Sequence, residues 1–429
     1  MEFSRKSYEE KLEALFVRFP SVQNTGFNDA YKPGLQHMYD MDGLLGKPSG
    51  KFRSIHVAGT NGKGSVSNML ASALASRGLR VGLYTSPHII DFRERMRIID
   101  GRCGAARAEL ISEQEVWDFI VDHEKDFDDL DLSFFEITTG MAFDWFARKG
   151  VDFAVIEAGL GGRLDSTNIL VPELSIVTSI GLDHCAMLGD TVESIAGEKA
   201  GIFKHDVPAL IGAAELSVAD VFKTRSMDVC CPLFFADESP VPSIEGLDLQ
   251  GEYQGENLRT TLKALSILGF SANDAILDAI AHTATRMDFH GRWELLHRSP
   301  DVICDIGHNP PALRKNFTQL QRIIDSGRRV IIVYGIMKDK DLSGILPLMP
   351  RDAYYIMVSP GTARAMTSDE LYRRCLDGLS EDQMENCGSV ADGIARALEL
   401  NASDPGNTLI YIGGSTFVVS EAVTYFEGL

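Results

Sequence analysis

The sequence predicts an α/β protein of two domains, and three observations support this prediction. Short apolar runs alternate with helix-like stretches, a glycine-rich loop follows the first apolar run, and the chain has 429 residues. Such alternation is typical of parallel sheets that are covered by helices on both faces. Because 45% of the residues are hydrophobic and domains usually contain roughly 100–200 residues, we expect a first domain over residues 1–289 and a second over 290–429.

Eight apolar runs are the predicted strands, and a helix-like stretch separates each from the next. The first series comprises residues 54–57, 81–84, 153–157 and 174–180, and the second 302–305, 330–334, 354–358 and 409–412. We expect a further helix near the N-terminus and another that ends around Arg286. Residues 206–250, which contain Pro208, Pro232, Pro240 and Pro242, are expected to form irregular structure with several weak strands at the edge of the first domain.

The glycine-rich loop at residues 56–65 predicts a phosphate site. Val66, Met69, Leu70, Ala73 and Leu74 recur at the helical period directly after it, and Gly78 marks the end of that helix. Glycines let successive backbone N–H groups converge on one point, and the helix adds the positive end of its dipole. Lys63 can reach terminal phosphates, and the Ser65 hydroxyl can hold magnesium. Gly64 separates these two residues, which differs from the loop of common GTPases and kinases; a glycine turn with an incidental lysine is the alternative interpretation.

Charge and cysteine content exclude several classes of function. The formal net charge is −20 and the pI is near 4.9, whereas nucleic-acid binding requires a basic surface. Seven cysteines occur without a C-x-x-C pair, so neither a disulfide framework nor a zinc site is expected. The N-terminus lacks the apolar core of a signal peptide, and no segment approaches the ~20 apolar residues that span a bilayer. We therefore expect a cytoplasmic protein with no nucleic-acid or membrane partner.

Polar residues follow several predicted strands, where open α/β sheets place their ligands. Glu157 ends one strand before a glycine-rich turn and is a candidate magnesium ligand; a solvated strand end is the alternative. His184 follows another strand and is a candidate metal ligand, although a lone histidine is more often simply hydrogen-bonded within the fold. Lys199 lies at a helix end and, considered alone, is most often a surface lysine.

Ten segments in a fixed order form the most specific pattern in the chain. They are HVAGTNGKGSVS from His56, YTSPHIIDFRERM from Tyr84, FFEITT from Phe134, VIEAGLGGRLDSTNIL from Val155, SIGLDHCAMLG from Ser179, EKAGIFK from Glu198, QGENLRTTLKAL from Gln254, GRWE from Gly291, DIGHNP from Asp305 and YGIMKDKD from Tyr334. Together they resemble the folylpolyglutamate synthase and dihydrofolate synthase family, a branch of the Mur ligases. The resemblance implies a P-loop ATPase domain with a parallel-rich central sheet, then a smaller Rossmann-like domain, with ATP between them.

The resemblance assigns catalytic roles to matching positions. Lys63 would bind phosphate, and Ser65 with Glu157 would hold one Mg²⁺ ion. His184 would bind a second Mg²⁺ ion, and Lys199 would carry a carbamate, an anion that supports this second ion. Lys63, Glu157, His184 and Lys199 are therefore the expected catalytic residues.

The resemblance also assigns the ligand contacts. ATP would contact Gly59, Thr60, Asn61, Gly62, Lys63, Gly64 and Ser65 in the loop, and Asn257, Arg292, Asp305 and His308, which it implies lie in the second domain. The folate contacts would be Ser86, His88, Arg95, Phe135 and Asp165, with Phe135 stacked on the flat ring system. Two positions depart from the family pattern, His290 in place of proline and Ile306 in place of glycine, and we expect altered loop geometry there.

The implied activity is an ATP-dependent ligation of L-glutamate through an acyl phosphate. The acceptor would be dihydropteroate, a reduced folate or both; the bifunctional form of the enzyme, acting as a monomer, is the expectation, and the polyglutamate activity alone is an alternative. A Mur ligase for a UDP-linked precursor usually carries a separate domain before its phosphate loop, whereas only 58 residues precede Gly59. A nucleotide-driven switch without ligation would leave the motifs of the second domain unexplained.

Overall fold

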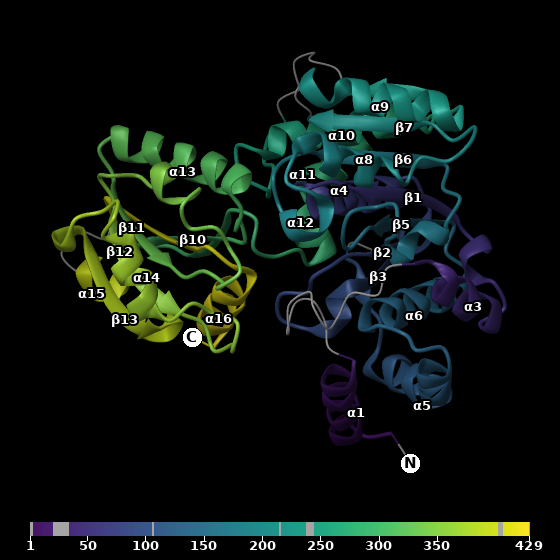
Figure 1. The fold of residues 1–429 in the computed structure, drawn as a ribbon, viewed down its shortest axis with the longest axis horizontal. Coiled ribbons are helices and arrows are strands. Elements are labelled where there is room, and N and C mark those ends of the chain that lie inside the picture. Colours follow the sequence, from purple (N-terminus) through teal and green to yellow (C-terminus); the bar gives the residue numbers. More distant parts are fainter. Residues whose placement is uncertain are drawn as a thin grey trace. The chain divides into compact units, whose positions relative to one another are not determined.

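The computed structural model describes residues 3–19, 34–104, 107–213, 216–236, 244–401 and 406–428. Its contacts divide the chain into two compact units (Figure 1). The first comprises Met1–Asp248 and Gln254–Phe289, and the second comprises Leu249–Tyr253 and His290–Leu429. The chain therefore enters the second unit for five residues, returns to the first, and then forms the rest of the second.

An eight-stranded sheet forms the centre of the first unit, in the order β4-β3-β2-β5-β1-β6-β7-β8. β3 and β4 run antiparallel at one edge, and the other neighbouring strands pair in parallel. The strands are β1 (Arg53–Ala58), β2 (Arg80–Tyr84), β3 (Met96–Asp100), β4 (Glu109–Leu110), β5 (Phe153–Glu157), β6 (Leu174–Ser179), β7 (Ala209–Ala213) and β8 (Leu233–Phe235). The parallel-rich sheet that we predicted is thus confirmed.

Helices cover both faces of this sheet because its strands are apolar on both sides. Phe146 of α6 packs against Gly82, on the face that also carries Ala154 and Ile156. Side chains of β2 and β5 that alternate with these point to the opposite face, where α4 contacts both strands. The helices are α1 (Arg5–Arg18), α3 (Gln36–Leu44), α4 (Lys63–Ala75), α5 (Glu113–Asp129), α6 (Phe134–Lys149), α7 (Cys185–Leu188), α8 (Val192–Ala200), α9 (Leu216–Val229), α10 (Gln254–Ile267), α11 (Asp274–Ala281) and α12 (Thr283–Met287).

The second unit contains a six-stranded sheet in the order β13-β12-β11-β14-β10-β9, parallel except for β9. Tyr355 and Met357 of β12 join the core shared with α13 and α14, whereas Ile356 and Val358 face Gly393 of α15. Helices therefore cover both faces, as in a Rossmann-like fold. The elements are β9 (Glu294–His297), β10 (Asp301–Asp305), α13 (Pro310–Asp325), β11 (Arg329–Tyr334), β12 (Tyr354–Ser359), α14 (Ser368–Cys375), β13 (Met384–Ser389), α15 (Val390–Asn401), β14 (Thr408–Gly413) and α16 (Thr416–Glu427).

All eight predicted strands are present with nearly the predicted bounds. Residues 206–250 form β7 and β8 at one edge of the sheet, in keeping with the weak strands expected there, but the expectation of otherwise irregular structure was wrong, since the 14-residue helix α9 lies between them. Pro240 and Pro242 lie outside the described residues. Within the described part of the chain, no helix combines the length and apolarity that a membrane span requires.

Candidate active site

The phosphate loop lies where β1 ends, between the ends of β5 and β6. Gly62 precedes α4 with a φ of 87°, a conformation that favours glycine. The helix begins at Lys63, and its first N–H groups have no acceptor within the helix. Together with the helix dipole, these groups form an anion site directly after the strand.

The end of β6 holds the loop in place. Thr178 Oγ1 and Ser179 Oγ donate to the carbonyl of Asn61 at 2.7 and 2.9 Å, and Thr60 N donates to Ser179 O at 2.8 Å. A Cβ atom at Gly59 would lie 2.0 Å from Thr178 Oγ1. The glycine is therefore required by a close approach of neighbouring atoms.

Two lysines meet at the start of the loop. Lys63 Nζ donates to Gly59 O at 3.0 Å and to Thr60 O at 3.3 Å, and Lys199 Nζ donates to Gly59 O at 2.9 Å. Lys199 is only 4% exposed. The expectation of a surface lysine, which follows when the residue is considered alone, was therefore wrong. Burial and then the nearby charge of Lys63 lower the pKa of Lys199 to about 7.

The proposed magnesium ligands come from three separate elements. Ser65 lies in the first turn of α4 and is buried, and its Oγ accepts from Gln254 Nε2 at 3.2 Å. Glu157 is also buried, pairs in register with Val57 of the neighbouring strand, and accepts from Ser86 N at 3.4 Å. His184 precedes α7, and its Nε2 lies 3.7 Å from Asp183 Oδ2. No group of three or more His, Cys, Asp or Glu side chains that could hold a metal occurs among the described residues.

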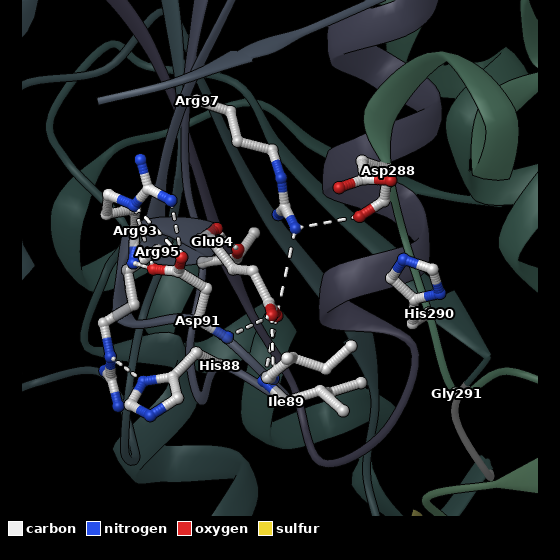
Figure 2. A network of polar contacts seen from close by, with 12 residues as sticks. His88, Ile89, Asp91, Arg93, Glu94, Arg95, Arg97, Asp288, His290 and Gly291 are labelled. Carbon is white, nitrogen blue, oxygen red and sulfur yellow. Dashed lines mark hydrogen bonds and ion pairs between the residues drawn. The ribbon is translucent and has the colours of Figure 1, made fainter. Parts of the chain in front are cut away.

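A polar network shapes the loop that follows β2 (Figure 2). The buried carboxylate of Glu94 accepts from the backbone N–H groups of Ile89, Ile90 and Asp91 at 2.8, 2.7 and 2.7 Å. Glu94 also lies 4.0 Å from the guanidinium of Arg97, which donates to the carbonyl of Asp288 at 3.0 Å. The bonds to Glu94 therefore hold the backbone of this loop in one conformation.

The same loop orients His88. Arg95 is 3% exposed, and its Nε donates to His88 Nδ1 at 2.9 Å, while its guanidinium lies 5.3 Å from the centre of the Phe134 ring. Burial, followed by the charge of Arg95, lowers the pKa of His88 well below its ordinary value. Nδ1 is thus the acceptor nitrogen of a neutral ring.

Two further predicted folate residues meet at the turn after β5, Phe135 from α6 and Asp165 from the turn itself. The ring of Phe135 contacts the backbone of Gly159 and lies 5.9 Å from the ring of Tyr84. Asp165 is buried, which raises its pKa, and it accepts from Leu160 N at 2.8 Å and from the N–H and hydroxyl of Thr167. Asp165 therefore organises the glycine-rich turn of which it is part.

Asn257 lies in the first unit, on α10, so its expected place in the second domain was wrong. A Cβ atom at Gly62 would lie 2.3 Å from its Oδ1. Arg292, Asp305 and His308 do belong to the second unit. The structure thus brings Asn257 to the phosphate loop itself.

Asp305 is the centre of its loop in the second unit. Its carboxylate accepts from Tyr253 Oη at 2.6 Å, Trp293 N at 2.9 Å, Gly307 N at 2.8 Å and Asn316 Nδ2 at 2.6 Å. His308 Nδ1 lies 2.9 Å from Ile306 O, and Arg292 Nη1 donates to His290 O at 2.5 Å. His290 and Gly291 both bond Glu294, and Ile306 N donates to Gly291 O.

Comparison of the sequence with known proteins identifies the family. Residues 291–416 match the family model of the Mur ligase, glutamate ligase domain. The dihydrofolate synthase/folylpolyglutamate synthase of Bacillus subtilis is 33% identical over 426 residues, which cover 91% of this chain and 94% of that protein. The chain belongs to this family.

Solved structures of family members share the whole fold. A folylpolyglutamate synthase of Mycobacterium tuberculosis complexed with ADP covers 98% of both chains with a TM-score of 0.86 at 28% identity. The bifunctional folylpolyglutamate synthase/dihydrofolate synthase of Yersinia pestis, complexed with AMPPNP and Mn, has a TM-score of 0.80 at 26% identity and covers 98% of both chains. The predicted Mur ligase architecture is confirmed, and the chain is an ATP-dependent ligase of this family.

Sequence reasoning missed several residues that support the phosphate loop and the loop of His88. Thr178 and Ser179 secure the phosphate loop, Glu94 secures the loop of His88, and Gln254 contacts Ser65. Each makes its contact across a turn or between segments distant in sequence. All four stood within or directly beside motifs that we had singled out, which was the only signal available.

Proposed function

We propose that this chain joins L-glutamate to folate-type carboxylates, both forming dihydrofolate from dihydropteroate and extending the γ-glutamyl tail of reduced folates. The observation that carries the proposal is the phosphate loop, in which Lys63 and Ser65 start α4 beside Glu157 on the neighbouring strand. The names of the Bacillus and Yersinia relatives support both activities, and ADP and AMPPNP in the solved relatives support ATP as the substrate that supplies the phosphoryl group.

The proposed reaction passes through an acyl phosphate, because a carboxylate is a poor electrophile. An oxygen of the substrate carboxylate attacks the γ-phosphorus of ATP, the bond to the β–γ bridging oxygen breaks, and ADP leaves. The amine of glutamate then attacks the acyl carbon and loses a proton, and the tetrahedral intermediate expels phosphate to leave an amide. Lys63 and the first N–H groups of α4 would stabilise the charge on the transferred phosphoryl oxygens.

The donor set fits divalent metal ions. Ser65 and Glu157 offer buried hydroxyl and carboxylate oxygens, which Mg²⁺ prefers, and His184 would serve a second site. When bound, the ions would neutralise negative charge on the phosphates. Manganese in the Yersinia structure supports a divalent ion.

Lys199 is suited to carry the carbamate that the resemblance implies. A carbamate forms when a neutral amine adds to carbon dioxide and loses a proton, so the amine must first be deprotonated. A pKa of about 7 leaves a large neutral fraction at physiological pH. The product is an anion close to Lys63, and its buried position would shield it from water.

The substrate contacts complete the proposal. Phe135 would stack on the pterin ring, and Ser86, His88, Arg95 and Asp165 would shape the folate side. Asn257, Arg292, Asp305 and His308 would contact the nucleotide, as the resemblance implies. The Mycobacterium relative is named only as a folylpolyglutamate synthase, so the polyglutamate activity alone is the second candidate.

The acyl phosphate is tested by isotope transfer. A substrate with ¹⁸O in its reacting carboxylate should deliver one ¹⁸O atom to the released phosphate, and unlabelled phosphate accompanying amide product would contradict the step. Lys63→Ala should abolish the transfer in a folded protein. The control Lys223→Ala removes an exposed lysine of α9 and should leave the transfer unchanged; transfer at a normal rate in Lys63→Ala would contradict the role of Lys63.

A further inference from the structure

Gln254 connects α10 to the phosphate loop through its side chain. It opens the helix and is 1% exposed, and its Nε2 donates to Ser65 Oγ at 3.2 Å. Its Oε1 accepts from Asn257 Nδ2 at 2.8 Å. The two amides therefore form a chain of hydrogen bonds that ends on the Ser65 hydroxyl.

The second amide fixes the direction of the first. Asn257 uses its Nδ2 for Gln254, while its Oδ1 lies against Gly62, where a Cβ atom would come within 2.3 Å. Because its carbonyl accepts from Asn257, Gln254 presents its NH₂ group to Ser65. The donor in this contact is thus Gln254.

A serine hydroxyl has one O–H and two acceptor lone pairs. The bond from Gln254 occupies one lone pair of Ser65 Oγ, which leaves the second for a metal ion and the O–H for a phosphate oxygen. A side chain without an N–H at position 254 would leave the hydroxyl free to rotate. Groups that orient a metal ligand in this way typically change metal affinity or activity by 10–100-fold when they are removed.

We propose that Gln254 is a positioning residue that sets the direction in which Ser65 binds the metal of a metal–nucleotide complex. The inference rests on the proposed function, because it assumes that Ser65 holds the ion. Gln254 acts only through Ser65, and no role in contacting substrate is assigned to it. Position 254 should therefore affect the metal dependence of nucleotide binding more than nucleotide binding itself.

The test measures binding at equilibrium and does not depend on turnover. ADP is titrated into the intact protein by calorimetry, without metal and at a series of Mn²⁺ concentrations, which separates the metal-free Kd from the half-saturating Mn²⁺ concentration. In Gln254→Met, which keeps the side-chain length without an N–H, the half-saturating concentration should rise about tenfold, whereas the metal-free Kd should change less than twofold.

A double-mutant cycle shows whether the effect passes through Ser65. Ser65→Ala should raise the half-saturating concentration by a similar factor, and adding Gln254→Met to it should cause no further change. Thr261→Val is the matched control, since Thr261 is buried in the same helix and its hydroxyl bonds the carbonyl of Asn257; its Mn²⁺ dependence should equal that of the wild type.

Three results would overturn the inference. The first is a Gln254→Met protein that binds Mn²⁺ like the wild type, and the second is an effect that adds fully to that of Ser65→Ala. The third is an equal weakening of metal-free and metal-dependent binding, as expected for a purely structural role. The proposed function fails in a different way: the wild type itself would not bind ADP, or Ser65→Ala would retain full Mn²⁺ dependence.

Discussion

Lys63 and Lys199 donate hydrogen bonds to one acceptor, the carbonyl oxygen of Gly59, at 3.0 and 2.9 Å. Burial is the main penalty on the charged form of Lys199, and repulsion by Lys63 at the same carbonyl adds to it. The pKa of Lys199 falls to about 7 as a result. The geometry of the loop thus determines the chemical state of the second lysine.

This relationship predicts how stability depends on pH. The pKa of Lys199 is about 7 in the folded protein, against an ordinary value of 10.5, so between these pH values the unfolded chain binds more protons. The free energy of unfolding contributed by this group therefore increases as pH rises from 7 toward 10.5. Lys199→Met should lack this increase when urea unfolding is followed at pH 7 and pH 9 without carbon dioxide or metal. Lys223→Met is the exposed control, and identical pH dependence in all three proteins would contradict the prediction.

Gly62→Ala should weaken nucleotide binding and destabilise the protein. The new Cβ would lie 2.3 Å from Asn257 Oδ1 at a φ of 87°, so strain and steric overlap combine; strain of this kind costs about 1–3 kcal/mol. Gly104→Ala is the control, since Gly104 has a φ of 66° but no atom within 4 Å of the added Cβ. Urea unfolding should show a larger loss of stability for Gly62→Ala than for Gly104→Ala. ADP titration should show weakened binding for Gly62→Ala alone. Equal losses in both variants would show that the contact with Asn257 is unimportant.

Thr167→Val should destabilise the turn after β5. The hydroxyl of Thr167 donates to Asp165 and lies 2.7 Å from Nε2 of the buried His56, whose pKa is lowered to about 3 by burial and then by the charge of Lys204. Valine would leave both partners without this bond, at a cost of about 1–3 kcal/mol.

Thr283→Val provides the comparison for this change. Its hydroxyl is also buried, but it donates to the carbonyls of Ala279 and Ile280 in the preceding helix α11. We expect a loss below about 1 kcal/mol there. Urea unfolding curves of the two variants measure the difference, and a Thr167→Val protein as stable as Thr283→Val would contradict the account of this network.

Glu94→Gln should loosen the loop of His88. In the wild type, both carboxylate oxygens of Glu94 accept hydrogen bonds from backbone N–H groups. The glutamine amide keeps one acceptor oxygen but turns its NH₂ group, a donor, toward the remaining N–H groups. Amide hydrogen exchange of residues 89–91 should accelerate at least tenfold, since about 1.4 kcal/mol of lost local stability corresponds to that factor. Glu109→Gln, in the edge strand β4, serves as the control; unchanged exchange in Glu94→Gln would show that other contacts hold the loop.

The sequence was sufficient to predict eight of the parallel strands because their apolar runs are continuous and lie between helices. It did not identify β3 and β4, which pair antiparallel at the sheet edge, and for residues 206–250 it predicted weak strands in irregular structure but not the helix α9. Prolines bordering β7 and β8 stand outside those strands, so they interrupt no hydrogen bond of the sheet. These elements depend on pairing between strands that are distant in sequence, and the local pattern of apolar residues carries no information about that pairing.

Within the site, residue types with distinctive local context were easier to find than supporting residues. Lys63, Ser65 and Glu157 stand beside glycines at strand or helix ends, and the structure places them where the neighbouring central strands β1 and β5 end. The burial of Lys199 and the contact of Gln254 with Ser65 depend on tertiary packing, across 140 residues from Gly59 in the first case and 189 residues in the second. No periodicity or motif spacing reports such contacts.

The central claim is ligation of glutamate driven by ATP. The most direct measurement is phosphate release from MgATP with L-glutamate, run separately with dihydropteroate and with tetrahydrofolate, with the products identified by mass. We predict phosphate release and a mass gain of one glutamate residue with each acceptor. A gain with tetrahydrofolate alone would restrict the enzyme to the polyglutamate activity, and phosphate release independent of both acceptors, with no glutamate added, would contradict the account.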